Sequence, residues 1–121
     1  GAPAMMQTAI ARGRFMEEVG GGFFDKSERD NLFITGAFSL LNVLLGTSMQ
    51  AVLDEMNLPA TVTEALLYEQ GEFAPFLKLS RLCESFDGAA LLKAAEELHL
   101  SPEQLNRAHV LALSFADSLQ G

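Results

Sequence analysis

Residues 32 to 45 read Leu32-Phe33-Ile34-Thr35-Gly36-Ala37-Phe38-Ser39-Leu40-Leu41-Asn42-Val43-Leu44-Leu45, a nearly continuous apolar run. A helix that is apolar on almost every side is hidden either in a protein core or in a membrane. The run is shorter than the roughly 18 to 20 residues that a bilayer needs, and polar side chains interrupt it. It predicts a buried core helix from about Ser27 or Arg29 to Leu45, in which Gly36 and Ser39 let a neighbouring backbone approach closely.

The segments on both sides of this run also carry helical spacing, and none shows the sustained alternation of a half-buried strand. The chain is therefore predicted to be all-α, with about seven helices in one compact domain spanning residues 1–121. Helix-breaking and capping residues place the other helices. The first spans residues 4–19. The next begins with Thr47 and Gln50 and ends before Pro59, and another begins with Thr61 and Glu64 and ends at Gly71. The last three begin at Pro75, at Asp87, and at Ser101 with Pro102 and Gln104.

Composition excludes several classes of function. The formal net charge is −8, with only eight Lys and Arg side chains, which argues against binding to nucleic acid or to anionic membranes. Hydrophobic residues make up 49% of the chain, so some apolar surface is expected to meet a partner. Cys83 is the only cysteine, which excludes an internal disulfide and fits a reducing cytoplasm, and its apolar neighbours predict a buried thiol.

Candidate catalytic and metal-binding residues are few. His99 and His109 are the only histidines, and neither lies in a metal-binding motif such as His-Glu-x-x-His. Cys83 has no neighbouring base in the sequence that would make it a nucleophile. The triplet 20–22 is all glycine but lacks the lysine of a phosphate-binding loop, and it is better explained as a hinge. We expect no catalytic residue, no metal and no cofactor.

Three further features have both a functional and a plain structural explanation. Arg12 and Arg14 are potential phosphate ligands, but nearby Glu17 and Glu18 favour ordinary helix ion pairs. Residues 90–112 have the outline of a helix-turn-helix, yet their second helix is too poor in positive charge for DNA.

The third feature is the pair of aromatic residues that follows the glycine triplet. Phe23 and Phe24 are either a lid over the core or a contact for a partner, and the sequence favours neither alternative. They are the candidate interaction surface.

The order of these signals resembles the bacterial HDOD domain, in the version found after EAL domains in cyclic-di-GMP signalling proteins. The resemblance covers most of the chain and rests on packing motifs of moderate specificity. The motifs are Ala11-Arg12-Gly13-Arg14-Phe15-Met16-Glu17, residues 32–41, Leu44-Leu45-Gly46-Thr47-Ser48-Met49, Leu58-Pro59, Glu64-Ala65-Leu66-Leu67, and Gly71 followed by a new helix. Two residues depart from the family pattern. Gly13 stands where we expect alanine, and glycine there costs about 1 kcal/mol of helix stability. Asn42 replaces a frequent aspartate.

The resemblance implies a compact HD-like helical bundle without phosphohydrolase activity. In the related HD phosphohydrolases the matching helix reads Gly-Leu-Leu-His-Asp and supplies two metal ligands, whereas this chain has Ser39 and Leu40 at those two positions. Neither side chain replaces an imidazole and a carboxylate in holding a divalent cation. HDOD modules are longer than this chain, so we expect it to be the carboxy-terminal part of a larger EAL–HDOD protein.

The leading hypothesis is a non-catalytic regulatory module that contacts the EAL domain of its parent protein, a second copy of itself, or both. Its mechanism is a shift in helix packing that biases the state of the partner. One alternative is a residual metal-dependent phosphohydrolase acting on nucleotides. A second alternative is a DNA-binding regulator, which predicts binding that weakens steeply with salt.

Overall fold

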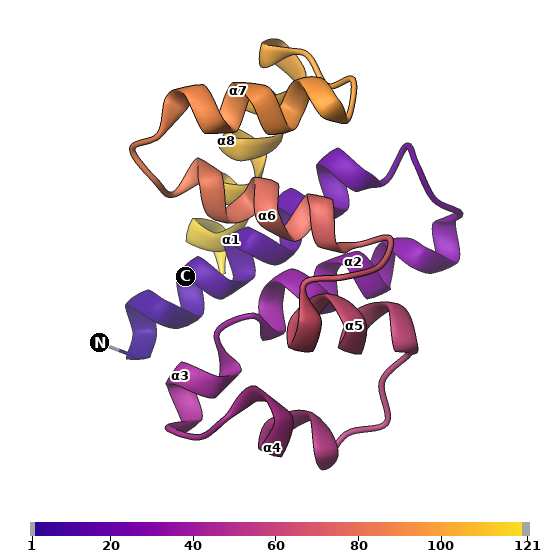
Figure 1. Cartoon of the computed structure of the whole chain (residues 1–121). Helices are drawn as coiled ribbons and strands as arrows, with labels where there is room; N and C mark the ends of the chain where they lie inside the picture. The colour runs from indigo at the N-terminus through magenta and orange to yellow at the C-terminus, as the bar shows by residue number, and fades with distance from the viewer. Residues whose placement is uncertain (1, 120–121) are drawn as a thin grey trace.

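The computed structural model describes residues 2–119, and over that range the chain folds into eight α-helices without a strand (Figure 1). This confirms the all-α class. The helices are α1 (Ala2–Gly20), α2 (Lys26–Phe38), α3 (Leu41–Leu45), α4 (Met49–Asp54), α5 (Ala60–Tyr68), α6 (Ala74–Cys83), α7 (Gly88–Glu97) and α8 (Pro102–Ser118). The eighth helix arises because the predicted central helix is divided into α2 and α3.

The division falls at Ser39 and Leu40, so the prediction of one helix reaching Leu45 is wrong. The Ser39 hydroxyl donates a hydrogen bond to the carbonyl of Gly36 at 2.6 Å, and the Ser39 N–H donates to the same carbonyl at 3.2 Å. A serine that bonds its own helix backbone in this way competes with the regular helical ladder. The regular helix therefore stops at Phe38, and a new short helix begins at Leu41.

The second half of the apolar run is also less buried than its sequence predicts. Leu32, Thr35 and Gly36 of α2 are buried, as expected of a core helix. No residue of α3 is buried, and Val43 and Leu45 are 52% and 62% exposed. The prediction of a helix enclosed on all sides is therefore wrong: α2 buries one face, and α3 buries no residue.

Close crossing of α1 and α2 explains both glycines in their contact. A Cβ atom at Gly36 would lie 2.6 Å from the carbonyl carbon and oxygen of Arg12, and one at Gly13 would lie 2.7 Å from the carbonyl oxygen of Phe33. Gly36 acts as predicted. Gly13, which the sequence suggested only as a cost to the helix, is required by the approach of the second backbone.

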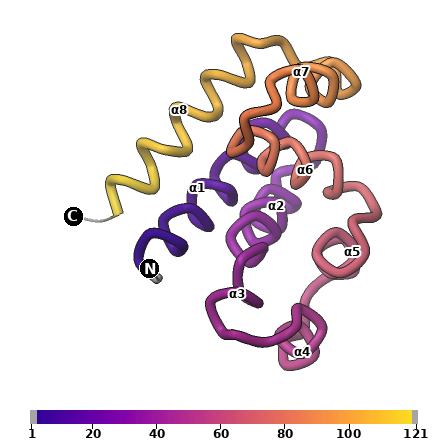
Figure 2. Tube along the Cα trace, turned by 60° about the vertical axis from the view of Figure 1, so that its left-hand side comes forward, coloured from indigo at the N-terminus to yellow at the C-terminus, as the bar shows by residue number. Residues whose placement is uncertain are grey.

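On its other side α1 runs beside α8 (Figure 2). The side of α8 that is buried carries mainly small residues, Ala108, Ala112 and Ala116, together with Leu105. Alanine at every fourth position lets two helices approach closely over several turns. The continuous core then runs through α1, α2 and α4–α8, around fully buried side chains such as Met16, Leu32 and Phe73.

Two of the predicted helix caps are confirmed and two are wrong. Ser101 forms a complete capping box with Gln104, and the Asp87 side chain accepts a hydrogen bond from the Ala90 N–H at 3.0 Å. The cap of α4 is Ser48 rather than Thr47, because it is the Ser48 hydroxyl that reaches the backbone.

Helix α5 differs from its prediction at both ends. It begins at Ala60, after Pro59, and uses no side-chain cap, so the expected role of Thr61 is wrong. It ends at Tyr68, before Gly71, where Glu69 takes a left-handed conformation with φ of 53°. Within residues 2–119 no helix combines the length and apolarity that crossing a bilayer requires.

Candidate functional site

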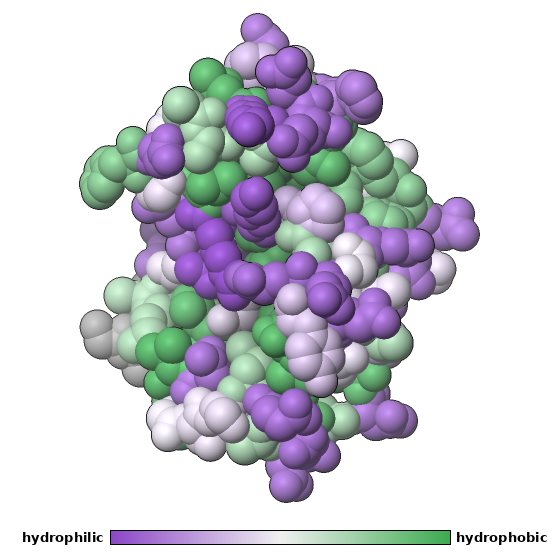
Figure 3. Space-filling model, viewed as in Figure 1, coloured by the Kyte–Doolittle hydropathy of each residue, from purple (hydrophilic) through white to green (hydrophobic). Residues whose placement is uncertain are grey.

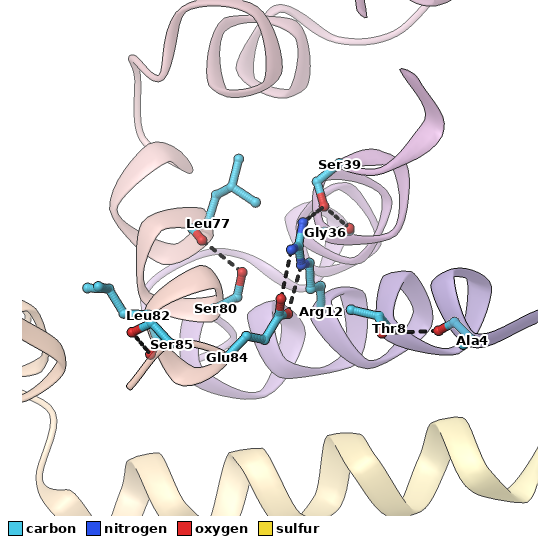
Figure 4. A network of polar contacts seen from close by, with 10 residues as sticks. All are labelled: Ala4, Thr8, Arg12, Gly36, Ser39, Leu77, Ser80, Leu82, Glu84 and Ser85. Carbon is cyan, nitrogen blue, oxygen red and sulfur yellow. Dashed lines mark hydrogen bonds and ion pairs between the residues drawn. The ribbon is translucent and has the colours of Figure 1, made fainter. Parts of the chain in front are cut away.

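A polar network joins α1 to the ends of α2 and α6 (Figure 4). Arg12 extends from α1, and its side chain is only 12% exposed. Its guanidinium donates two hydrogen bonds of 2.7 Å to the two carboxylate oxygens of Glu84, which follows α6. The remaining Nη1 donates to the Ser39 hydroxyl oxygen at 3.0 Å. One arginine therefore connects three helical segments.

A second arginine adds positive charge near this network. Arg81 Nη1 lies 3.2 Å from the Glu69 carboxylate, so it links α6 to the end of α5. Burial, and then the neighbouring charge of Arg12, lower the pKa of Arg81, while Glu69 and Glu84 act in the opposite direction. Each arginine has its own carboxylate, which offsets the cost of holding two cations close together in a partly dry interface.

Ser39, one of the two residues that the sequence analysis aligns with metal ligands, belongs to this network. Ser39 is buried, and its hydroxyl both donates to the Gly36 carbonyl and accepts from Arg12. A divalent cation beside Ser39 would have to compete with the Arg12 guanidinium for the hydroxyl oxygen, and the Glu84 carboxylate is already paired with that guanidinium. In the described part of the chain, no three His, Cys, Asp or Glu side chains converge on a point that could hold a metal ion.

A small cavity lies beside Arg12, between α1, α6 and α8. Its volume is about 110 Å³, and Phe15, Ser80, Cys83 and His109 are among the residues that line it. Pockets that bind small molecules usually have volumes of roughly 300 to 1,000 Å³. This cavity is therefore too small for a nucleotide.

The two histidines lie in different surroundings. His109 packs edge-on against Phe15, with ring centroids 6.2 Å apart. His99 is exposed between α7 and α8, where it takes a left-handed conformation with φ of 57°. The aromatic contact gives His109 a packing role.

Cys83, which the sequence predicts to be buried, is half-buried at the end of α6. Burial, and to a smaller extent the charge of Glu84, raise the pKa of its thiol to about 11. At neutral pH the sulfur therefore stays protonated, and a protonated thiol is a poor nucleophile.

The candidate interaction surface, Phe23 and Phe24, lies in the turn between α1 and α2. Phe24 makes edge-to-face contacts with Phe73 and Phe76, at centroid distances of 5.2 and 5.6 Å. Phe23 contacts Phe76 at 5.1 Å but leaves 49% of its own surface exposed. Phe24 thus packs on the core, and Phe23 is the ring that a partner can reach.

Arg14 forms ordinary ion pairs within its own helix, as predicted, whereas Arg12 pairs with a residue outside its helix. Arg14 lies 3.5 Å from Glu17 and 2.9 Å from Glu18, on the same helix. Sequence reasoning missed the pairing of Arg12 with Glu84 because the two residues are 72 positions apart. Nothing in the local sequence distinguishes Arg12 from Arg14, and only the crossing of α1 with α6 separates their roles.

The surface carries more exposed apolar side chains than the sequence analysis identified. On α8, Val110, Leu111 and Leu113 are 43% to 57% exposed, and Phe86 between α6 and α7 is fully exposed. The sequence does indicate the exposure of the three α8 residues. Apolar side chains occur on every side of residues 105–113, and a helix with one buried face leaves some of them exposed. Single exposed apolar residues are common, but clusters of them indicate contact surfaces.

No family model matches this chain, and neither a curated protein nor a solved structure is similar to it. The resemblance to HDOD domains therefore stays a prediction from the motifs in the sequence. The function has to be argued from the polar network and the exposed apolar surface.

Proposed function

We propose that this chain is a non-catalytic regulatory module that acts through protein contacts in cyclic-di-GMP signalling. In this proposal it is the carboxy-terminal part of an HDOD module in the cytoplasm of a bacterium. Its partner is the EAL domain of the parent protein, a second copy of itself, or both. The observation that supports the proposal is the pairing of Arg12 with Ser39 and Glu84, because Ser39 is one of the two residues that the HDOD resemblance aligns with metal ligands.

The same network suggests how a contact at the surface could change the molecule. Arg12 joins α1 to α2 and α6, and Phe23 lies in the turn that connects α1 to α2. A partner that moves this turn would alter the relative positions of α1 and α2. Because those helices cross at two glycines without intervening side chains, a small displacement repacks the whole contact.

Association is tested by analytical ultracentrifugation of the chain, alone and mixed with the EAL domain of its parent protein. We expect concentration-dependent self-association or a stable complex with the EAL domain. Phe23→Ala should weaken the association by about tenfold or more, as loss of an aromatic anchor does. A monomer that also fails to bind the EAL domain would contradict the proposal.

Phe86→Ala is the matched control, because Phe86 is another exposed phenylalanine on a different connection. It should leave the association within about twofold of the wild type, since most residues outside a hot spot contribute little. The reverse result, a loss with Phe86→Ala and none with Phe23→Ala, would reject the Phe23 surface while leaving the protein-contact role in place.

A further inference from the structure

The middle of the chain carries no positive charge. Between Arg29 and Lys78 the sequence contains no Lys, Arg or His. The acidic residues in the same stretch, after Asp30, are Asp54, Glu55, Glu64, Glu69 and Glu72. Helices α3, α4 and α5 all lie within it. This stretch of the chain therefore carries negative charge only, unlike α1, α6, α7 and α8, which each carry Lys or Arg. Of its carboxylates, Glu69 at the end of α5 is paired with Arg81 of α6.

These three helices also expose apolar side chains. We name residues 41–68, which comprise α3, α4 and α5, the acidic lobe. Val43 and Leu45 of α3 are 52% and 62% exposed, Met56 after α4 is 37% exposed, and Tyr68 at the end of α5 is 62% exposed. Helices α3 and α4 lie at one end of the molecule, on the side away from α7 (Figures 1 and 2).

Helix α3 is only partly covered. It packs chiefly against α4, with Leu41 on the core, and none of its five residues is fully buried. Hydrophobic surface adjoins hydrophilic surface in the lower part of the space-filling view, where Figure 1 has α3 and α4 (Figure 3). Isolated helices this short are unstable in water, so an apolar one that is only partly covered gains stability from any segment that packs on it.

We propose that the acidic lobe is the docking site for a basic amphipathic helical segment of a protein partner. This inference rests on the proposed role in protein contacts and names the chemistry of the contact. The apolar side chains of the partner contact exposed residues of α3 such as Val43, and its Lys or Arg side chains pair with Asp54 and Glu55 at the end of the adjacent α4. A second copy of the lobe is disfavoured as the occupant, because its charge has the same sign.

Other exposed surfaces do not select a partner in this way. The groove of about 650 Å³ next to α6 is lined by Glu69 and Glu97 but also by Lys78 and Arg81. The exposed apolar residues of α8 follow Arg107. A surface with charges of both signs both attracts and repels any charged partner. The acidic lobe, in contrast, attracts only positively charged partners.

The test uses two synthetic peptides and the intact chain. Both peptides form an amphipathic helix of about four turns, long enough to cover α3 and α4, with leucine along one face. One has lysine beside the leucines and the other has glutamate. We expect the lysine peptide to bind at least about tenfold more tightly in isothermal titration calorimetry, with an affinity that falls as salt is added.

Matched variants locate the binding site. Asp54→Lys with Glu55→Lys reverses two charges at the end of α4, and Glu96→Lys with Glu97→Lys makes the same change in net charge at the end of α7. The α4 variant should lose at least about tenfold in affinity and the α7 variant only about twofold, because charge acts strongly only within a Debye length. Val43→Ser with Leu45→Ser should also weaken binding, and circular dichroism checks that each variant is folded.

Equal binding of the two peptides, or equal loss in the α4 and α7 variants, would overturn the inference. Comparing the peptide titration with the ultracentrifugation of the wild type separates this inference from the proposed function. If the wild type binds the EAL domain but does not prefer the lysine peptide, the docking site is wrong and the regulatory role stands. If the wild type neither self-associates nor binds the EAL domain, the regulatory role itself fails.

Discussion

Gly36 fixes the distance between α1 and α2. A Cβ atom there would overlap the Arg12 backbone at 2.6 Å, and a helix backbone cannot give way as a flexible side chain can. Gly36→Ala should therefore lower the free energy of unfolding by about 2 kcal/mol, even though alanine favours helix formation by about 1 kcal/mol. Urea denaturation measures the change.

Gly88→Ala is the control for that substitution. A Cβ atom at Gly88, the first residue of α7, would have no neighbour within 4 Å. This variant should be as stable as the wild type or more stable by up to about 1 kcal/mol. If Gly36→Ala were as harmless as Gly88→Ala, the close crossing of α1 and α2 would be wrong.

The thiol of Cys83 should react slowly with alkylating or disulfide reagents. Its pKa of about 11 leaves little thiolate at pH 8, so labelling should be roughly a hundredfold slower than for a thiol with the ordinary pKa. Because the pKa is raised in the folded state, the contribution of this group to stability is complete below about pH 9 and is lost as the pH rises through about 11. Labelling as fast as in the urea-unfolded chain would contradict this.

At the scale of a helix, Glu84 holds α6 against α1 through Arg12. Glu84→Gln removes the charge that balances a guanidinium only 12% exposed, and should lower the free energy of unfolding by about 2 kcal/mol. Glu18→Gln removes the ion pair with Arg14, a more exposed arginine than Arg12. It should change the free energy of unfolding by less than about 0.5 kcal/mol. Thermal unfolding of the two variants measures the difference, and equal effects would argue against the network.

The start of α4 gives a test of helix capping. Ser48 accepts a hydrogen bond from the Ala51 N–H at 3.1 Å, whereas the side chain of its neighbour Thr47 is not the cap. Ser48→Ala should cost about 1 kcal/mol of stability, and Thr47→Ala should cost only a few tenths. The opposite order, measured by chemical denaturation, would restore the cap predicted from the sequence.

The start of a helix was predictable from the sequence where a capping side chain or a proline determines it. Asp87, Ser101 and Pro102 mark the starts of α7 and α8, because a capping side chain acts on backbone only three residues away. The break after α2 was not predictable. It depends on the Ser39 hydroxyl, which bonds the Gly36 carbonyl and also meets Arg12 from another helix.

For the whole molecule, the all-α class followed from helical spacing along the entire chain. The candidate site did not follow, because Arg12 and Glu84 come together only once α1 and α6 have packed. The exposure of α3 was missed for a similar reason. An apolar run predicts that a segment avoids water, but which residues are covered depends on the neighbours, and α3 packs chiefly against α4 alone.

The proposed loss of metal chemistry depends above all on Arg12, which binds the Ser39 hydroxyl and pairs with Glu84. Titration with Mn²⁺, followed by paramagnetic broadening of backbone amide signals, tests this directly at Ser39 and its neighbours. We predict no saturable broadening around Ser39, because its hydroxyl is already bonded to Arg12 and the Glu84 carboxylate is paired with the same guanidinium. Saturable broadening centred on Ser39, with one ion per chain, would contradict the account.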